Sequence, residues 1–201
     1  MGTCLLGAVI AGGCALSSVI QLPPVDLDLM GAGAGTFSAK AGEPVRNVAR
    51  FSGVQIPVNL GGGGFTLPLD ALQITPGDGT GNKRLVSGQA SGSLCLDACT
   101  AAGVDGDVCS LVCQDGTLVI HVWVGPADAI EADCESGVLY TFEVTLDASG
   151  QPTGVTVTPD SFEPETLALL TGGEEIGICI ELIAPFDATI TLGSITLNFR
   201  L

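Results

Sequence analysis

Short runs of apolar and β-branched residues, many of them alternating with polar residues, recur along the whole chain. Runs of this kind are typical of half-buried β-strands. They cover residues 19–29, 45–51, 54–60, 65–74, 118–124, 138–146, 154–158, 176–183 and 188–201. Gly-, Pro- and Asp-rich turns separate them, including residues 61–64, 75–82 and 147–150. The pattern predicts an all-β fold, an antiparallel β-sandwich or jelly roll, because parallel strands would need helices between them.

Two further segments refine this expectation. Residues 163–170 predict a helix that starts at Pro164 and ends before Gly172 and Gly173. Residues 190–201 resemble the closing strand of many jelly-roll carbohydrate-binding modules. That resemblance fits the predicted fold class.

The amino-terminal residues have the pattern of an export signal. Residues 1–22 carry no charge, and residues 5–13 form an apolar run of signal-peptide length that is too short to span a bilayer. The stretch Val9–Cys14 resembles a bacterial lipoprotein signal, which implies cleavage before Cys14 and a diacylglycerol on its sulfur. With Ala15 after the cysteine, the resemblance implies sorting to the outer membrane or cell surface. The alternatives are cleavage after Ser17 and an uncleaved anchor that ends at Leu22.

These assignments divide the chain. Residues 1–13 are the predicted signal peptide and residues 14–24 a lipid-anchored tether. Residues 25–201 are a single β-sandwich domain, in which residues 93–116 form a cysteine-rich insert.

The cysteines of the domain support export. Without Cys4 and Cys14 an even set remains, and in an exported chain such a set predicts disulfides. Its members are Cys95, Cys99, Cys109, Cys113, Cys134 and Cys179. The first four form two CxxxC pairs, and each pair lies on one face if the segment is helical. Two such helices folded back on each other predict the bridges Cys95–Cys113 and Cys99–Cys109, which leaves Cys134 to pair with Cys179.

The predicted helical hairpin has suitable end signals. Ser93 caps the first helix, Gly103 ends it and Asp107 starts the second. The spacing resembles the twin CxxxC helical hairpins of small disulfide-stapled proteins. Two alternatives stay open: a zinc site made of the four thiolates, and a β-hairpin around Asp115-Gly116 that places residues 108–114 on a strand.

Composition and charge narrow the function classes. The chain has six basic and 22 acidic residues and a net charge of −16. Because nucleic-acid binding needs a positively charged surface, this charge balance excludes a nucleic-acid-binding protein. Hydrophobic residues make up 46% of the chain and charged residues 14%, which excludes intrinsic disorder. The acidic residues predict a solvated, soluble exterior.

One face of a predicted strand carries the best ligand-binding candidates. His121 is the only histidine and Trp123 the only tryptophan, and alternation along residues 118–124 places both on one face with Val119. An indole plane beside an imidazole edge is suited to a glycan or another ligand. The competing interpretation is that this face lies under a loop or is only partly exposed.

Catalytic and metal-binding patterns are weaker. A nucleophilic serine would depend on His121 as its base, and no Gly-x-Ser-x-Gly motif occurs in the sequence. Acidic residues that suit glycoside hydrolysis by type alone are Glu131, Asp133, Glu135 and Glu143, but aromatic residues make up only 4% of the chain. Oxygen-rich segments at residues 105–107, around Asp78 and at residues 128–133 are candidates for a structural calcium ion, and none has EF-hand spacing.

The sequence therefore predicts a non-catalytic, exported lipoprotein of the cell envelope, with a structural or adhesive role and no cofactor beyond a structural calcium ion. Its expected partners are the membrane, through the lipid anchor, and a glycan or an envelope protein. The first alternative is a glycan- or ligand-binding module that uses His121 and Trp123. The second is a carrier of apolar ligands, which the apolar composition favours.

Overall fold

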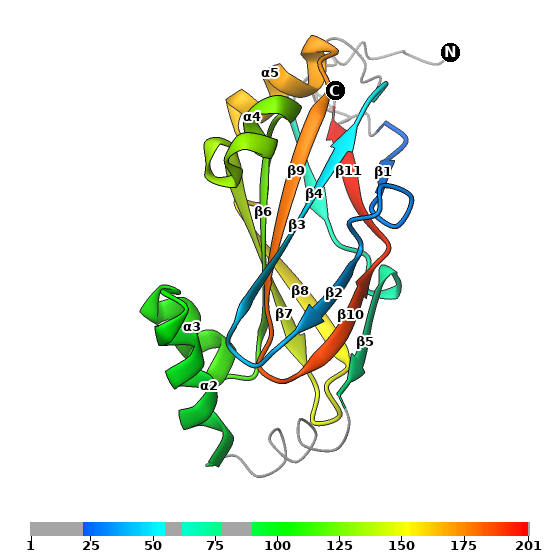
Figure 1. Cartoon of the computed structure of the whole chain (residues 1–201). Coiled ribbons are helices and arrows are strands. Elements are labelled where there is room, and N and C mark those ends of the chain that lie inside the picture. Colours follow the sequence, from blue (N-terminus) through cyan, green and yellow to red (C-terminus); the bar gives the residue numbers. More distant parts are fainter. Residues whose placement is uncertain (1–21, 55–61, 78–89, 201) are drawn as a thin grey trace, which may run out of the picture.

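The computed structural model describes residues 22–54, 62–77 and 90–200, and antiparallel β-sheets are its main secondary structure (Figure 1). The largest sheet has five strands in the order β3-β9-β6-β7-β8. Their bounds are β3 Pro44–Phe51, β9 Ile176–Ile183, β6 Leu118–Pro126, β7 Val138–Leu146 and β8 Pro152–Thr158. All eight residues of β9 are buried, which agrees with an apolar run that only Glu181 interrupts. The predicted β-rich, antiparallel fold is confirmed.

Two three-stranded sheets contain the remaining strands. One has the order β1-β11-β4 and the other β2-β10-β5. Their bounds are β1 Val25–Asp28, β2 Thr36–Ala39, β4 Gly62–Thr66, β5 Leu72–Pro76, β10 Ala188–Leu192 and β11 Ser194–Arg200. Gly193 joins the two sheets, because its carbonyl accepts from the Leu29 N–H at 3.0 Å and its own N–H donates to the Ala71 carbonyl at 2.7 Å.

Two predicted strands are each divided in two. The 3₁₀ turn η1 (Leu69–Ala71) interrupts residues 65–74, and Gly193 interrupts residues 188–201. The glycines at 62–64, predicted to be a turn, belong to β4. A Cβ at Gly63 would lie 2.2 Å from the Asn198 carbonyl oxygen and 2.5 Å from the Phe162 ring, so close packing requires glycine there.

One apolar core contains buried residues from the five-stranded sheet and from both smaller sheets. Residues Leu118, Ile120, Val122 and Val124 face this core, as the alternation along the strand predicted. Side-chain amides tie the layers at both edges: Asn47 Nδ2 donates to the Thr36 carbonyl at 2.9 Å, and Gln151 Nε2 donates to the Ile74 carbonyl at 3.4 Å.

The cysteine-rich insert is a helical hairpin that projects from one end of the sheets (Figure 1). It consists of α2 (Ala90–Ala101) and α3 (Gly106–Cys113). The bridges are Cys95–Cys113 and Cys99–Cys109, which agrees with the antiparallel prediction. The zinc and β-hairpin alternatives are wrong, because the four sulfurs are bonded in pairs and residues 108–113 are helical.

The ends of the two insert helices differ slightly from the prediction. Helix α2 begins at Ala90, ahead of the expected cap Ser93. Gly103 follows α2 with φ +76°, as its predicted role at the helix end requires. Asp105, and not Asp107, caps α3, because its side chain accepts the Asp107 N–H at 2.9 Å.

Three short elements complete the fold. Helix α5 (Pro164–Gly172) was predicted, and Gly173 ends it with φ 72°. Helix α4 (Ala127–Ala132) and the 3₁₀ turn η2 (Cys134–Ser136) were not predicted. They lie over the outer face of the five-stranded sheet and determine what that face exposes.

Some predictions fall on residues outside the described ranges. These are the lipoprotein signal, Cys14, most of the tether, most of the predicted strand at 54–60 and the acidic segment around Asp78. Within the described ranges, no helix has the length and apolar character needed to cross a membrane.

Candidate functional site

A row of polar residues crosses the outer face of the five-stranded sheet. In the strand register, Glu181 on β9 is opposite Arg46 on β3 and also opposite His121 on β6. Side chains at paired positions point to the same side of a sheet and lie close enough to interact. The three residues therefore form a continuous group, although they come from widely separated parts of the chain.

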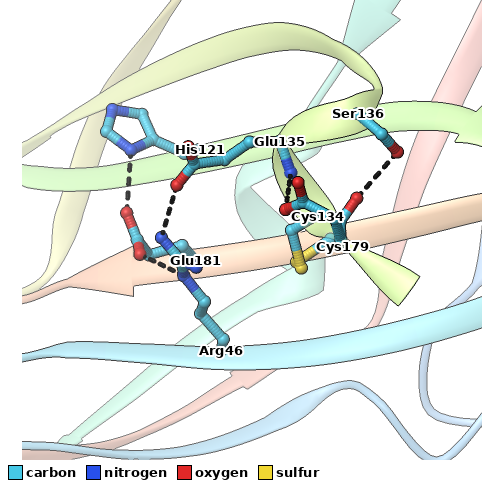
Figure 2. Close-up of a disulfide and its surroundings, with 8 residues drawn as sticks. Arg46, His121, Cys134, Glu135, Ser136, Cys179 and Glu181 are labelled. Carbon is cyan, nitrogen blue, oxygen red and sulfur yellow. Dashed lines mark hydrogen bonds and ion pairs between the residues drawn. A yellow bond between two sulfur atoms is a disulfide. The ribbon is translucent and has the colours of Figure 1, made fainter. Parts of the chain in front are cut away.

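Glu181 is at the centre of this group and uses both carboxylate oxygens (Figure 2). Its Oε2 accepts a hydrogen bond from Arg46 Nε, and its Oε1 lies 3.1 Å from His121 Nδ1. The Glu181 side chain is 8% exposed, whereas that of Arg46 is 47% exposed. Arg46 also reaches Glu135 of η2, with 3.4 Å between Nη2 and Oε1.

The electrostatics of Glu181 follow from this geometry. Burial alone would raise the pKa of its carboxyl group, but the hydrogen bonds from His121 and Arg46 outweigh burial and lower the pKa. The same contact with Glu181 raises the pKa of Arg46. The carboxylate is therefore ionised at neutral pH and fixes the orientation of the imidazole ring.

Trp123 lies next to this polar group but is covered. Its exposed fraction is 7%. The Arg46 Cζ lies 5.5 Å from the centre of its ring, and the His121 ring packs edge-on at 5.5 Å between centroids. Val119, His121 and Trp123 were predicted to share one face of the strand. None of them belongs to the main core, which agrees with that prediction. Little of the indole is left for a glycan to stack on.

The cover over Trp123 is built from α4, η2 and a disulfide. Ile130 of α4 is fully buried and packs in one cluster with Trp123, Cys134 and Cys179. The Cys134–Cys179 bond, predicted by elimination, ties η2 to the inner strand β9 (Figure 2). The face is therefore covered, but by a short helix and a 3₁₀ turn and not by the loop that the alternative interpretation expected.

Three glycines form the seat of α4. Gly125, Gly137 and Gly177 all lie against Ile130, and a Cβ on Gly177 would come within 2.8 Å of both Ile130 Cβ and Ala127 Cα. Gly125 and Gly177 are directly paired in the sheet. Side chains at these positions would push the helix off the sheet, so the glycines set how closely α4 approaches.

A second ion cluster holds the outer side of α4. Arg50 of β3 donates to Glu131 at 2.9 and 2.8 Å, to Asp128 at 2.7 Å and to Glu175 at 2.7 Å. Glu131, then Asp128 and Glu175, raise the pKa of Arg50 by hydrogen bonding, and Arg50 lowers the pKa of Glu131. The cluster connects the edge strand β3 to the helix.

Three of the four acidic residues considered for catalysis have structural contacts here. Glu131 binds Arg50, Glu135 binds Arg46, and Asp133 caps η2 by accepting the Glu135 N–H at 3.0 Å. Glu143 lies opposite Val119 in the sheet register. In the part of the chain that the structure describes, no group of three or more His, Cys, Asp or Glu side chains has a metal-binding arrangement.

Sequence reasoning did not include Arg46 or Glu181 among the candidate residues. The missed signal was the single charge inside the apolar run of residues 176–183, since a charge on a buried strand needs a partner. Arg46 lies far away in sequence, and only the β3–β9 register shows that it supplies this partner.

The comparisons with known proteins add no relationship. No protein-family model matches the chain, and no curated protein or solved structure gives a significant match. Any functional proposal must therefore rest on the chain's own geometry.

Proposed function

We propose that this protein is a non-catalytic, extracytoplasmic component of a cell envelope, held at a membrane by a lipid on Cys14, with a structural or adhesive role. The observation that carries the proposal is the set of three disulfides, which joins all six cysteines of residues 25–201. Disulfides of this kind form and persist in oxidising, non-cytoplasmic compartments. The lipoprotein-like stretch Val9–Cys14 supplies a matching export and anchoring signal.

The contacts of the polar residues support a structural role. The only histidine is oriented by Glu181, and Glu181 in turn is bonded to Arg46. Within the described ranges, every buried side-chain nitrogen or oxygen has a hydrogen-bond partner. Such a network fixes a surface and its cover, which suits a rigid module that must persist outside the cell.

The sheet arrangement fits the same proposal. We interpret the two smaller sheets, joined at Gly193, as one layer that packs across the core from the five-stranded sheet, and so as a β-sandwich. Mutual packing of two sheets buries the apolar faces of both and leaves the outer faces polar. Disulfide-stapled sandwiches are a common architecture among extracellular domains.

The intact mass of the protein recovered from its native envelope tests the proposal. We expect a chain that starts at Cys14 and carries acyl groups, with six thiols that appear only after reduction. A Cys14→Ser variant should leave the membrane fraction, whereas Cys4→Ser, the matched control, should not change the mature protein. A chain that starts at Met1 with free thiols would overturn the proposal. A start after Ser17 would retain export and remove the lipid anchor.

The non-catalytic role needs a separate test. In cells that lack the protein, a His121→Gln variant that folds and reaches the envelope should restore the wild-type phenotype. A folded and correctly located variant that restores nothing would favour catalysis by His121.

A further inference from the structure

A groove of about 460 Å³ lies beside α5, and Trp123 is not among the residues that line it. One side is formed by α5, with Ala168 and Leu169, and the other by the chain around β6 and β7, with Pro126 and Val138. Its volume is within the range of small ligand sites, and its floor is mainly apolar. Several of these apolar atoms reach the surface, since Ala168 and Pro126 are exposed and Leu169 and Val138 are half-buried.

Both sides of the groove are held in place by the fold. The buried Tyr140 hydroxyl donates to Thr166 Oγ1 and accepts the Glu163 N–H, each at 2.9 Å, and so fixes the first turn of α5. Leu170, 2% exposed, anchors the end of the same helix. On the other side, the Cys134 disulfide ties η2 to the sheet. The groove is therefore preformed, which lowers the entropic cost of binding.

The carboxylates at the edge of the groove indicate which kind of ligand it would bind. Glu165 and Glu174 both line the groove and are exposed. Among residues 22–54, 62–77 and 90–200, neither carboxylate takes part in an ion pair or a side-chain hydrogen bond, whereas the adjacent Glu175 binds Arg50 at 2.7 Å. An apolar floor between two carboxylates is complementary to a ligand in which an aliphatic group lies between two positively charged groups.

We propose that this groove binds a peptide segment of a partner protein, with an aliphatic side chain on Leu169 and Val138 and flanking Lys or Arg side chains at Glu165 and Glu174. The volume accommodates a few side chains, which is the scale of a short linear segment. The net charge of −16 repels anionic partners and favours the approach of basic ones. This inference does not depend on the lipid anchor or on the structural role proposed above.

Binding of a fluorescent Lys-Leu-Leu-Lys peptide to the purified protein, followed by anisotropy at low salt, tests the proposal. The matched probe is Glu-Leu-Leu-Glu, which has the same apolar core and the opposite charge. We expect saturable binding of the basic peptide only, and binding that weakens as salt is added. The double variant Glu165→Gln/Glu174→Gln should bind roughly fivefold to tenfold more weakly. Its control, Asp97→Asn/Asp115→Asn, makes the same change in net charge elsewhere and should keep most of the affinity.

A plug in the groove gives a second, independent test. Ala168→Arg places a long cationic side chain beside the two carboxylates from an exposed helical position, and should abolish peptide binding while the protein stays folded. Ala101→Arg, on exposed α2, is the matched control and should bind normally. Equal binding of the two peptides, or equal affinities of Ala168→Arg and Ala101→Arg, would overturn the groove proposal. Neither result would bear on the mass measurement that tests the proposed function.

Discussion

Replacing Gly177 by alanine tests whether the glycine seat controls the outer face. The new Cβ would lie 2.8 Å from Ala127 Cα and from Ile130 Cβ, while unstrained carbon contacts lie at about 3.5–4.0 Å. Helix α4 must therefore move by roughly 1 Å, and overpacking of this kind costs about 1–3 kcal/mol. Alanine also reduces the conformational entropy of the unfolded chain, which stabilises the folded protein by about 0.4–1 kcal/mol. We expect a net destabilisation of about 1–2 kcal/mol.

Gly154→Ala is the matched control for this substitution. Gly154 lies in β8, and a Cβ added there would meet no atom within 4 Å, so the unfolded-state term acts alone. We expect that variant to be more stable than wild type by up to about 1 kcal/mol. The same chemical change should thus have opposite signs at the two positions.

Urea denaturation monitored by tryptophan fluorescence measures both effects. Trp123 is the only tryptophan, and it lies directly under α4. Its emission should also shift to longer wavelength in folded Gly177→Ala, because the displaced helix admits water. If Gly177→Ala is as stable as Gly154→Ala, with an unchanged emission maximum, the glycine seat does not set the position of α4.

Three other contacts give shorter predictions. Glu181→Gln should destabilise the protein by about 1–3 kcal/mol at pH 7. Because the folded state lowers the pKa of Glu181, this difference in stability between wild type and variant should vanish as the pH falls through that pKa. Urea titrations that show a constant difference down to about pH 3 would contradict this prediction. Loss of the Cys134–Cys179 bond, which spans 45 residues, should cost about 4 kcal/mol if it acts through the entropy of the unfolded chain, and the shift in the denaturation midpoint of the double Cys→Ala variant checks this. Tyr140→Phe leaves the Glu163 N–H and the Thr166 hydroxyl without their partner and should cost about 1–3 kcal/mol, with faster amide exchange in α5; unchanged exchange there would contradict it.

The strands could be predicted because their patterns are local. Alternation along residues 118–124 correctly separated the core-facing side chains from those of the outer face, and the CxxxC spacing gave the pairing of the helical hairpin. Helix α4 was missed for a physical reason: it has six residues, and no side chain caps its start at Pro126. Such a short helix depends on tertiary packing, here of Ile130 against Gly125 and Gly137, which lie on either side of it in sequence, and against the distant Gly177.

The site was only half predictable for a related reason. His121 and Trp123 stood out by their rarity, but their surroundings depend on strand register. The β3–β9 and β6–β9 pairings bring Arg46 and Glu181 to His121, and together with α4 they turn an apparent aromatic platform into a covered one. Local patterns identify a face of a strand, whereas long-range pairing decides whether that face meets solvent.

The strand order of the two smaller sheets also constrains when the domain can assemble. Their central strands, β11 and β10, both lie within residues 188–200, with β1 and β4 as neighbours in one sheet and β2 and β5 in the other. These four neighbours therefore have no partner within their sheets until residues 188–200 emerge, and a chain that emerges from a ribosome or a translocon amino terminus first cannot complete either sheet early. Late closure of this kind would keep the chain in the extended state that passage through a secretion channel requires. It would also leave apolar edges exposed to aggregation in the interval, so we expect that a chaperone shields the nascent chain.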